Sequence, residues 1–256
     1  MVDMISEFPL FAFTTLSGLA AGAYAVSAPL RGKEQQKAAW LFPLVCIVLL
    51  GLGLCGTLAH LGHPERFLNA MANPTSMIAE EAYWSMAFGV LMVIDAVLCK
   101  AKGSAPVAVR VLGAIAAIGL MCVTANAYFT MHGNPVWTSP ATLALFVVGD
   151  VAMGAAMAAC FRVELASQKT FAGAAIAILA LCAASIAAIA AQFAGYGFDM
   201  APFIVGLVVG PAAGIVVYAL TMTGKLAPKI GAPLGFVLVL VGVVVARYFF
   251  YAASIL

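Results

Sequence analysis

The chain has 256 residues, of which 65% are hydrophobic and 9% are charged, and its formal net charge is +2. A soluble globular domain carries about 25% charged residues, so the composition excludes a soluble globule. The small net charge identifies no partner, and we expect nucleic acid not to be one.

Eight apolar runs follow one another along the chain, at about 8–28, 40–59, 80–99, 106–127, 141–161, 170–194, 201–222 and 233–251. A bilayer core needs roughly 20 apolar residues per helix. The short connections leave no room for a soluble domain. The sequence therefore predicts an all-α, polytopic membrane protein with eight transmembrane helices in one domain, 1–256. A division into two four-helix bundles, 1–129 and 130–256, is compatible with this order, although no convincing internal repeat is visible.

The basic residues alternate with the predicted helices. Ten of the 12 lie in or beside odd-numbered connections: Arg31, Lys33, Lys37, Lys100, Lys102, Arg110, Arg162, Lys169, Lys225 and Lys229. Loops rich in Lys and Arg stay in the cytoplasm. We therefore expect a multi-pass protein of the cytoplasmic membrane with both termini, and residues 60–81, on the outer side. The first apolar run has no basic residues before it, which predicts a retained helix.

The most informative segment is 60–81, which reads HLGHPERFLNAMANPTSMIAEE and lies between the second and third apolar runs. Gly62 and Pro64 are expected to end the second helix just after His60. Ser76 can cap the third helix, so that Glu80 and Glu81 fall in its first turns, where the helix dipole favours a carboxylate. Capping and helix-end electrostatics explain these residues singly. Proton-coupled chemistry at the membrane surface would explain why they occur together, and the residues alone leave both interpretations open.

Three ionisable residues lie inside predicted helices. Asp150 is near the middle of the fifth and Arg247 is in the outer half of the eighth, whereas Asp95, close to the cytoplasmic end of the third, is expected to be interfacial. An isolated charge there would cost about 2.5–3.5 kcal/mol on insertion scales. Asp150 and Arg247 are therefore interpreted as a pair, either a structural ion pair or a proton relay.

The cysteines and histidines give no ligand set for a redox metal. None of the six cysteines forms C-x-x-C, and none of the three histidines lies in the middle of a predicted helix. Iron–sulfur clusters need grouped thiolates. We therefore expect no haem, iron–sulfur cluster or other metal in this chain.

Several stretches resemble the membrane-anchor subunits of dimethyl sulfoxide reductase-type molybdoenzymes, within the wider NrfD and polysulfide reductase group. The first helix of those anchors is similar to EFPLFAFTTLSGLAAGAY at the N-terminus. Their H-L-G-x-P-x-R-x-x-N signature is similar to HLGHPERFLNAM, and their acidic residue opening the third helix matches EE at 80–81. The last helix, VGVVVARYFFY, also resembles their closing helix.

This resemblance implies a function in anaerobic respiration. The chain would anchor a molybdopterin catalytic subunit and a four-cluster iron–sulfur subunit, and it would carry the menaquinol-oxidation site rather than the catalytic centre of the complex. The family's essential histidine and acid carry over to His60 and Glu81. Arg66 matches the arginine of the signature, Tyr83 lies nearby, and the adjacent Glu80 is an alternative to Glu81.

Two alternatives remain open at this stage. The NrfD-like group shares the core seen here as LGHPERF, so the chain could instead reduce quinone; His60 favours the dimethyl sulfoxide reductase branch. A transporter or proton-translocating channel would use Asp95, Asp150 and Arg247 along its path. Broken helices and repeats are typical of transporters, and Pro211 is the one candidate break.

Overall fold

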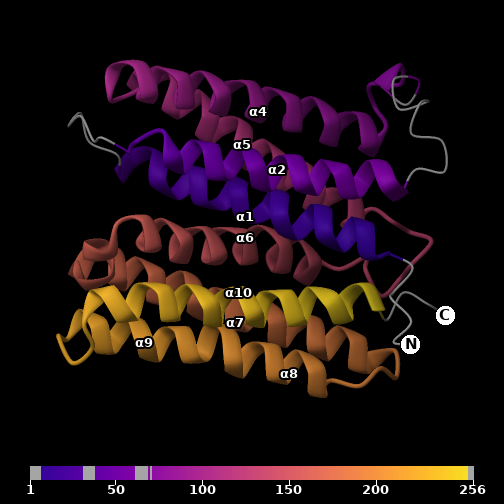
Figure 1. The fold of residues 1–256 in the computed structure, drawn as a ribbon. Helices are drawn as coiled ribbons and strands as arrows, with labels where there is room; N and C mark the ends of the chain where they lie inside the picture. Colours follow the sequence, from indigo (N-terminus) through magenta and orange to yellow (C-terminus); the bar gives the residue numbers. More distant parts are fainter. Residues whose placement is uncertain (1–6, 31–37, 61–68, 70, 253–256) are drawn as a thin grey trace.

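The computed structural model describes residues 7–30, 38–60, 69 and 71–252, and of Ala59 and His60 the backbone alone. Within these residues the chain is helical and contains no strand. Among the described residues, eight helical spans are long and apolar enough to cross a membrane, which confirms the predicted all-α membrane architecture (Figure 1). The helices are α1 (Phe8–Leu30), α2 (Leu41–His60), α4 (Met77–Lys102), α5 (Val107–Phe129), α6 (Pro140–Phe161), α7 (Lys169–Gly195), α8 (Ala201–Leu207), α9 (Ala213–Met222) and α10 (Pro228–Ala252).

Helices α8 and α9 form one span, Ala201–Met222, joined by a π-helical turn, Val208–Ala212. Pro211 lies in this turn. Proline has no N–H to donate, and a wider turn accommodates its ring. A short 3₁₀ helix, Val163–Ser167, connects α6 to α7. The proline therefore widens one turn without interrupting the span.

Helices α1 and α6 form the centre of the bundle. About 67% of the apolar span of each is buried, against 28–39% of every other span. Helix α1 packs against α2, α5 and α6 and contacts α10. It therefore lies between α2, α4 and α5 on one side and α6, α7 and α10 on the other (Figure 1). The division into halves at residue 129 stays a prediction, and α1 contacts helices of both.

Small residues allow the central helices to approach closely. A Cβ atom at Gly22 of α1 would collide with the backbone of Asp150 in α6, and one at Gly154 would collide with the backbone of Gly22. Gly210 and Gly242 make the same kind of contact between the π turn and α10. Glycine contacts of this type are how helices associate in lipid, where no hydrophobic force drives them together.

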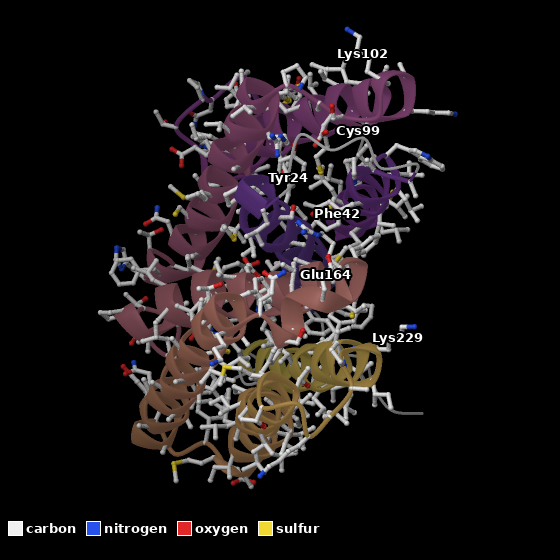
Figure 2. The ribbon with its side chains drawn as sticks, turned by 90° about the vertical axis from the view of Figure 1, so that its left-hand side faces the viewer. Tyr24, Phe42, Cys99, Lys102, Glu164 and Lys229 are labelled. Atoms are coloured by element: carbon white, nitrogen blue, oxygen red, sulfur yellow. The ribbon has the colours of Figure 1, made fainter. Side chains whose placement is uncertain are left out.

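The two ends of the bundle differ in charge. The end at which α1 finishes carries the described basic residues Lys100, Lys102, Arg110, Arg162, Lys169, Lys225 and Lys229. We call it the basic end, and Figure 2 looks onto it. The opposite end, called the acidic end, carries Glu7, Glu80, Glu81 and Asp199. The helix order thus brings together at each end the charges that the sequence distributes over alternate connections.

Candidate functional site

The segment singled out in the sequence lies at the acidic end. Helix α2 ends at His60, α4 begins at Met77, and these two helices pack against each other. The His60 side chain and Arg66 lie outside the described residues. Their roles at a quinol site stay predictions.

The start of α4 is as the sequence predicts. The Ser76 hydroxyl accepts a hydrogen bond of 3.2 Å from the Ala79 amide, satisfying one of the N–H groups that the first turn leaves open. Glu80 lies in this first turn, and Glu81 follows it. The cap therefore fixes the direction in which each carboxylate leaves the helix.

Glu81 leaves α4 on the side that faces the bundle. The residues four, seven and eleven positions later, which are Ser85, Phe88 and Met92, are buried on the same face. The Glu81 carboxylate lies close to the Thr124 hydroxyl of α5, without a hydrogen bond of standard geometry between them. Thr124 is only 4% exposed. The buried Thr124 hydroxyl thus faces the half-buried Glu81 carboxylate without forming a well-aligned hydrogen bond to it.

Further hydroxyl groups extend from this point across the acidic end of the bundle. Tyr128 and Tyr251 are buried, and both lie within range of an electrostatic interaction with Glu81. Their two hydroxyls interact with each other. The Tyr251 hydroxyl lies 3.0 Å from Thr14 Oγ1 of α1. Helices α1, α4, α5 and α10 thus each contribute one or more members of this group.

Aromatic rings surround the two tyrosines. Tyr128 stacks on Phe146 with ring centroids 5.0 Å apart, and Trp137 stacks on Phe250 at 5.1 Å. Trp137 Nε1 donates to the Phe250 carbonyl over 3.0 Å, which ties the connection after α5 to α10. The hydroxyls beside Glu81 therefore lie in apolar, rigid surroundings, where hydrogen bonds to charged groups are strengthened.

Glu80 and Tyr83 are placed differently from Glu81. Successive residues of a helix are rotated by about 100°, so Glu80 and Tyr83 project from other sides of α4. The Tyr83 hydroxyl donates to the Met71 carbonyl over 2.7 Å, and its side chain is exposed. The structure thus brings Glu81, and not Tyr83, to Thr124.

The predicted pair of Asp150 and Arg247 is present. Arg247 Nη2 donates to Asp150 Oδ1 over 2.6 Å, and the arginine is fully buried. Arg247 also donates to the carbonyls of Thr14 and Phe146, over 2.8 and 2.9 Å. A Cβ atom at Gly18 would collide with the Asp150 carboxylate. These contacts join α1, α6 and α10, and the packing around the Asp150 carboxylate leaves no space for a larger residue at Gly18. The arrangement therefore favours a structural role over a proton relay.

Asp95 is buried among the helices, and its interfacial depth in the membrane stays a prediction. It is fully shielded from solvent, and its carboxylate accepts hydrogen bonds from the Tyr24 hydroxyl (2.6 Å) and the Cys99 thiol (3.2 Å). Tyr24 of α1, which covers it, is 71 residues away in the chain.

Thr14, Thr124, Tyr128 and Tyr251 were not singled out in the sequence. Two spacings point to three of them: Thr124 and Tyr128 are four residues apart on one face of α5, and Tyr251 follows Arg247 by four residues in α10. Thr14 has no such signal. No group of three metal-binding side chains is found among the residues that the structure describes.

Comparison with known proteins identifies the family. A family model described as DMSO reductase anchor subunit (DmsC) matches residues 1–201, which include the 60–81 segment and all of α1 to α7. A search of curated proteins gave no match. Arg247 and Tyr251 lie beyond the matched residues, so their places in the site are known from the geometry alone. The resemblance seen in the sequence is confirmed: the chain belongs to the DMSO reductase anchor subunit family, and it is a multi-pass membrane anchor that associates with the catalytic and electron-transfer subunits of a DMSO reductase complex.

Proposed function

We propose that this chain binds menaquinol at the acidic end, takes up the protons of its two hydroxyl groups, and delivers its two electrons to an iron–sulfur partner subunit. One observation carries the proposal. The Glu81 carboxylate is directed into the bundle beside Thr124, a buried hydroxyl without a hydrogen bond of standard geometry. Buried polar groups normally have partners, so a substrate hydroxyl at this point would satisfy both.

The reaction converts a quinol to a quinone with loss of two protons and two electrons. His60 is the proposed ligand of one substrate oxygen and the first proton acceptor, because an imidazole has an ordinary pKa of about 6.5 and takes up a proton near neutral pH. Glu81 orients His60 or receives its proton and passes it to water at the membrane surface. Thr124 hydrogen-bonds the substrate, and Arg66 steers the headgroup or contacts the partner subunit.

The electrons leave through the partner. We propose a four-cluster iron–sulfur subunit that accepts them and a molybdopterin subunit that uses them. The reverse reaction, quinone reduction, uses the same groups, and the partner's potential decides the direction. Proton translocation through Asp150 and Arg247 is less well supported, because the pair is packed against the backbone of α1 at Gly18 and Gly22.

Proton release on the outer side requires the acidic end to face outward. We propose that the basic end lies in the cytoplasm, following the rule that Lys and Arg mark cytoplasmic connections. In a cysteine-free variant, a cysteine introduced at His132 of the acidic end is expected to react with an impermeant maleimide added outside cells, and one at Lys229 only after permeabilisation. The opposite labelling pattern would contradict both topology and mechanism.

The two adjacent glutamates provide a matched test of the site. Glu81→Gln keeps size and hydrogen bonding but removes the carboxylate, so quinol oxidation is expected to fall by about 10²-fold or more, the usual contribution of a positioned acid or base. Glu80→Gln alters the neighbouring residue on another side of α4 and is expected to keep near-normal rates. Both variants are assayed with a menaquinol analogue in complexes that assemble normally. A defect in Glu80→Gln alone would transfer the role to Glu80.

A further inference from the structure

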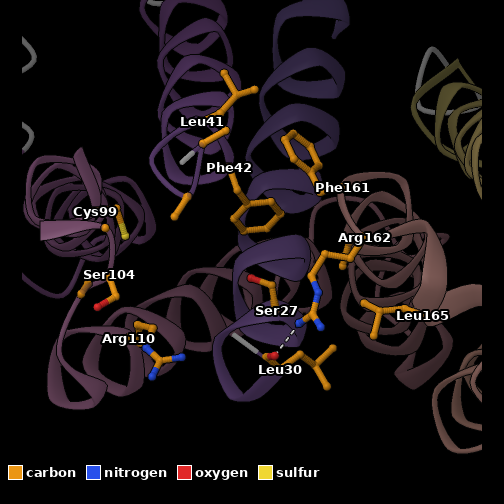
Figure 3. A pocket seen from close by; sticks show the side chains of 15 residues that line it. Ser27, Leu30, Leu41, Phe42, Cys99, Ser104, Arg110, Phe161, Arg162 and Leu165 are labelled. Atoms are coloured by element: carbon orange, nitrogen blue, oxygen red, sulfur yellow. Dashed lines mark hydrogen bonds between the residues drawn. The ribbon is translucent and has the colours of Figure 1, made fainter. Parts of the chain in front are cut away.

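The basic end contains a cavity that the proposed quinol chemistry does not use. It has a volume of about 270 Å³ and lies among the ends of α1, α2, α4, α5 and α6. The lining includes Ser27, Phe42, Ser104, Arg110, Phe161 and Arg162. Figure 3 shows Arg110 and Arg162 on either side of Ser27 and Leu30. Two arginines therefore lie among apolar and hydroxyl-bearing side chains where five of the predicted membrane-spanning helices end.

Capping of α1 explains only part of this arrangement. Arg110 Nη1 donates to the Ala28 carbonyl over 3.1 Å, and Arg162 Nη1 donates to the Leu30 carbonyl. Arg162 Nε also donates to Glu164 over 3.1 Å. A guanidinium has five N–H donors, so Arg162 keeps further donors beyond these two bonds among the described residues. Because Arg162 lines the cavity, its remaining donors are available to an anion bound there.

The surrounding charge also favours an anion. Besides the two arginines, the described part of the basic end carries Lys100, Lys102, Lys169, Lys225 and Lys229, and Glu164 is its exposed acid. The first turn of α5, which follows Ser104 and Ala105 of the lining, has no side-chain cap. Uncapped N–H groups at a helix start add positive potential.

An apolar groove adjoins the cavity. It has a volume of about 290 Å³, lies between α1, α6 and α7, and shares Leu30 with the cavity. Its walls include Val26, Ala155, Phe171, Ala174 and Ile178. The combination of a cationic cavity with an apolar groove running from it matches a molecule with a charged head and a hydrocarbon tail.

We propose that this is a binding site for one anionic phospholipid of the membrane leaflet at the basic end. The phosphate binds the remaining donors of Arg162 on the side that faces Arg110, with the Ser104 hydroxyl as a further donor, and one acyl chain follows the groove past Leu30. Basic pockets between transmembrane helices are a known kind of lipid-headgroup site. Because the site joins the ends of five helices, the lipid stabilises their arrangement from the side opposite the quinol site.

The test uses the complex isolated through a tag on this chain and transferred to nanodiscs of phosphatidylcholine with or without phosphatidylglycerol. Wild-type complex is expected to retain about one phosphatidylglycerol per chain in native mass spectrometry and to unfold at a higher temperature when this lipid is present. Arg162→Gln is expected to weaken retention about fivefold or more. Ala174→Phe, which fills the exposed groove, is expected to weaken it without removing a charge.

Lys229→Gln is the matched control, because it removes one exposed charge from the same end without touching the cavity or the groove. It is expected to retain lipid as wild type does. Equal losses in Lys229→Gln and Arg162→Gln would indicate diffuse electrostatic attraction and overturn the proposal. Stabilisation by inorganic phosphate alone, equal to that by the lipid, would also overturn it. Normal retention by Ala174→Phe would remove the groove from the site.

Discussion

The His60→Ala complex is expected to lose quinol-dependent reduction of the DMSO reductase partner almost completely while it still assembles. Removal of the imidazole takes away the proposed first proton acceptor, and loss of a positioned base typically costs about 10²–10⁴-fold in rate. An artificial electron donor feeds the partner's clusters directly and bypasses quinol deprotonation. Activity with that donor is therefore expected to stay at the wild-type value. Both rates are measured on membranes with matched amounts of complex.

His132→Ala is the control, since it removes an exposed histidine from another connection at the same end. It is expected to support normal quinol oxidation. Wild-type quinol oxidation by His60→Ala, in a complex that assembles at wild-type levels, would sink the proposed site. A loss of activity with both donors would instead indicate failed assembly.

Arg247→Met is expected to leave little folded protein. The substitution leaves Asp150 buried and without its charge partner, and breaking one side of a buried ion pair costs about 3–5 kcal/mol. It also removes the bonds to the carbonyls of Thr14 and Phe146 that join α10 to α1 and α6. Fluorescence-detected size exclusion of a tagged chain, together with the midpoint of thermal unfolding in detergent, measures this loss.

The double variant Arg247→Met with Asp150→Asn separates charge from packing. Because the uncompensated carboxylate is gone, the double variant is expected to recover part of the stability lost by Arg247→Met alone. Lys102→Met, at an exposed position, is the control for loss of a single positive charge. A double variant no more stable than Arg247→Met would contradict the ion-pair interpretation. Normal folding of both, with altered proton release, would favour a relay.

The spans could be predicted because lipid imposes a simple requirement on length and polarity. The positions of the helix ends were predicted less accurately, because capping residues, and not hydrophobicity, determine where a helix begins and ends. The third helix begins at Met77 because Ser76 caps it, three residues before the apolar run starts at residue 80. It ends at Lys102, where Gly103 adopts a left-handed conformation with φ of 77°. The last helix begins at Pro228, five residues before the predicted 233.

The site could be predicted only in part. Glu81 is conspicuous in the sequence, because a carboxylate beside an apolar run needs an explanation. Its neighbours are not, since single Thr and Tyr residues are common in membrane helices. Thr14, Thr124 and Tyr251 become a group only when α1, α5 and α10 pack together. The burial of Asp95 could not be predicted for the same reason, because Tyr24, which donates to its carboxylate, comes from a helix 71 residues away in the chain.

The central position of α1 has a consequence for how the protein is made. Its partners arrive in the order of synthesis, α2 and α5 early, α6 after them and α10 last. Until α10 has entered the bilayer, Thr14 lacks the tyrosine and arginine that it contacts in the finished bundle. Assembly is therefore completed late, by rearrangement of helices already in lipid. A chain that ends before residue 228 therefore lacks the two contacts that join Thr14 of the first helix to the last one.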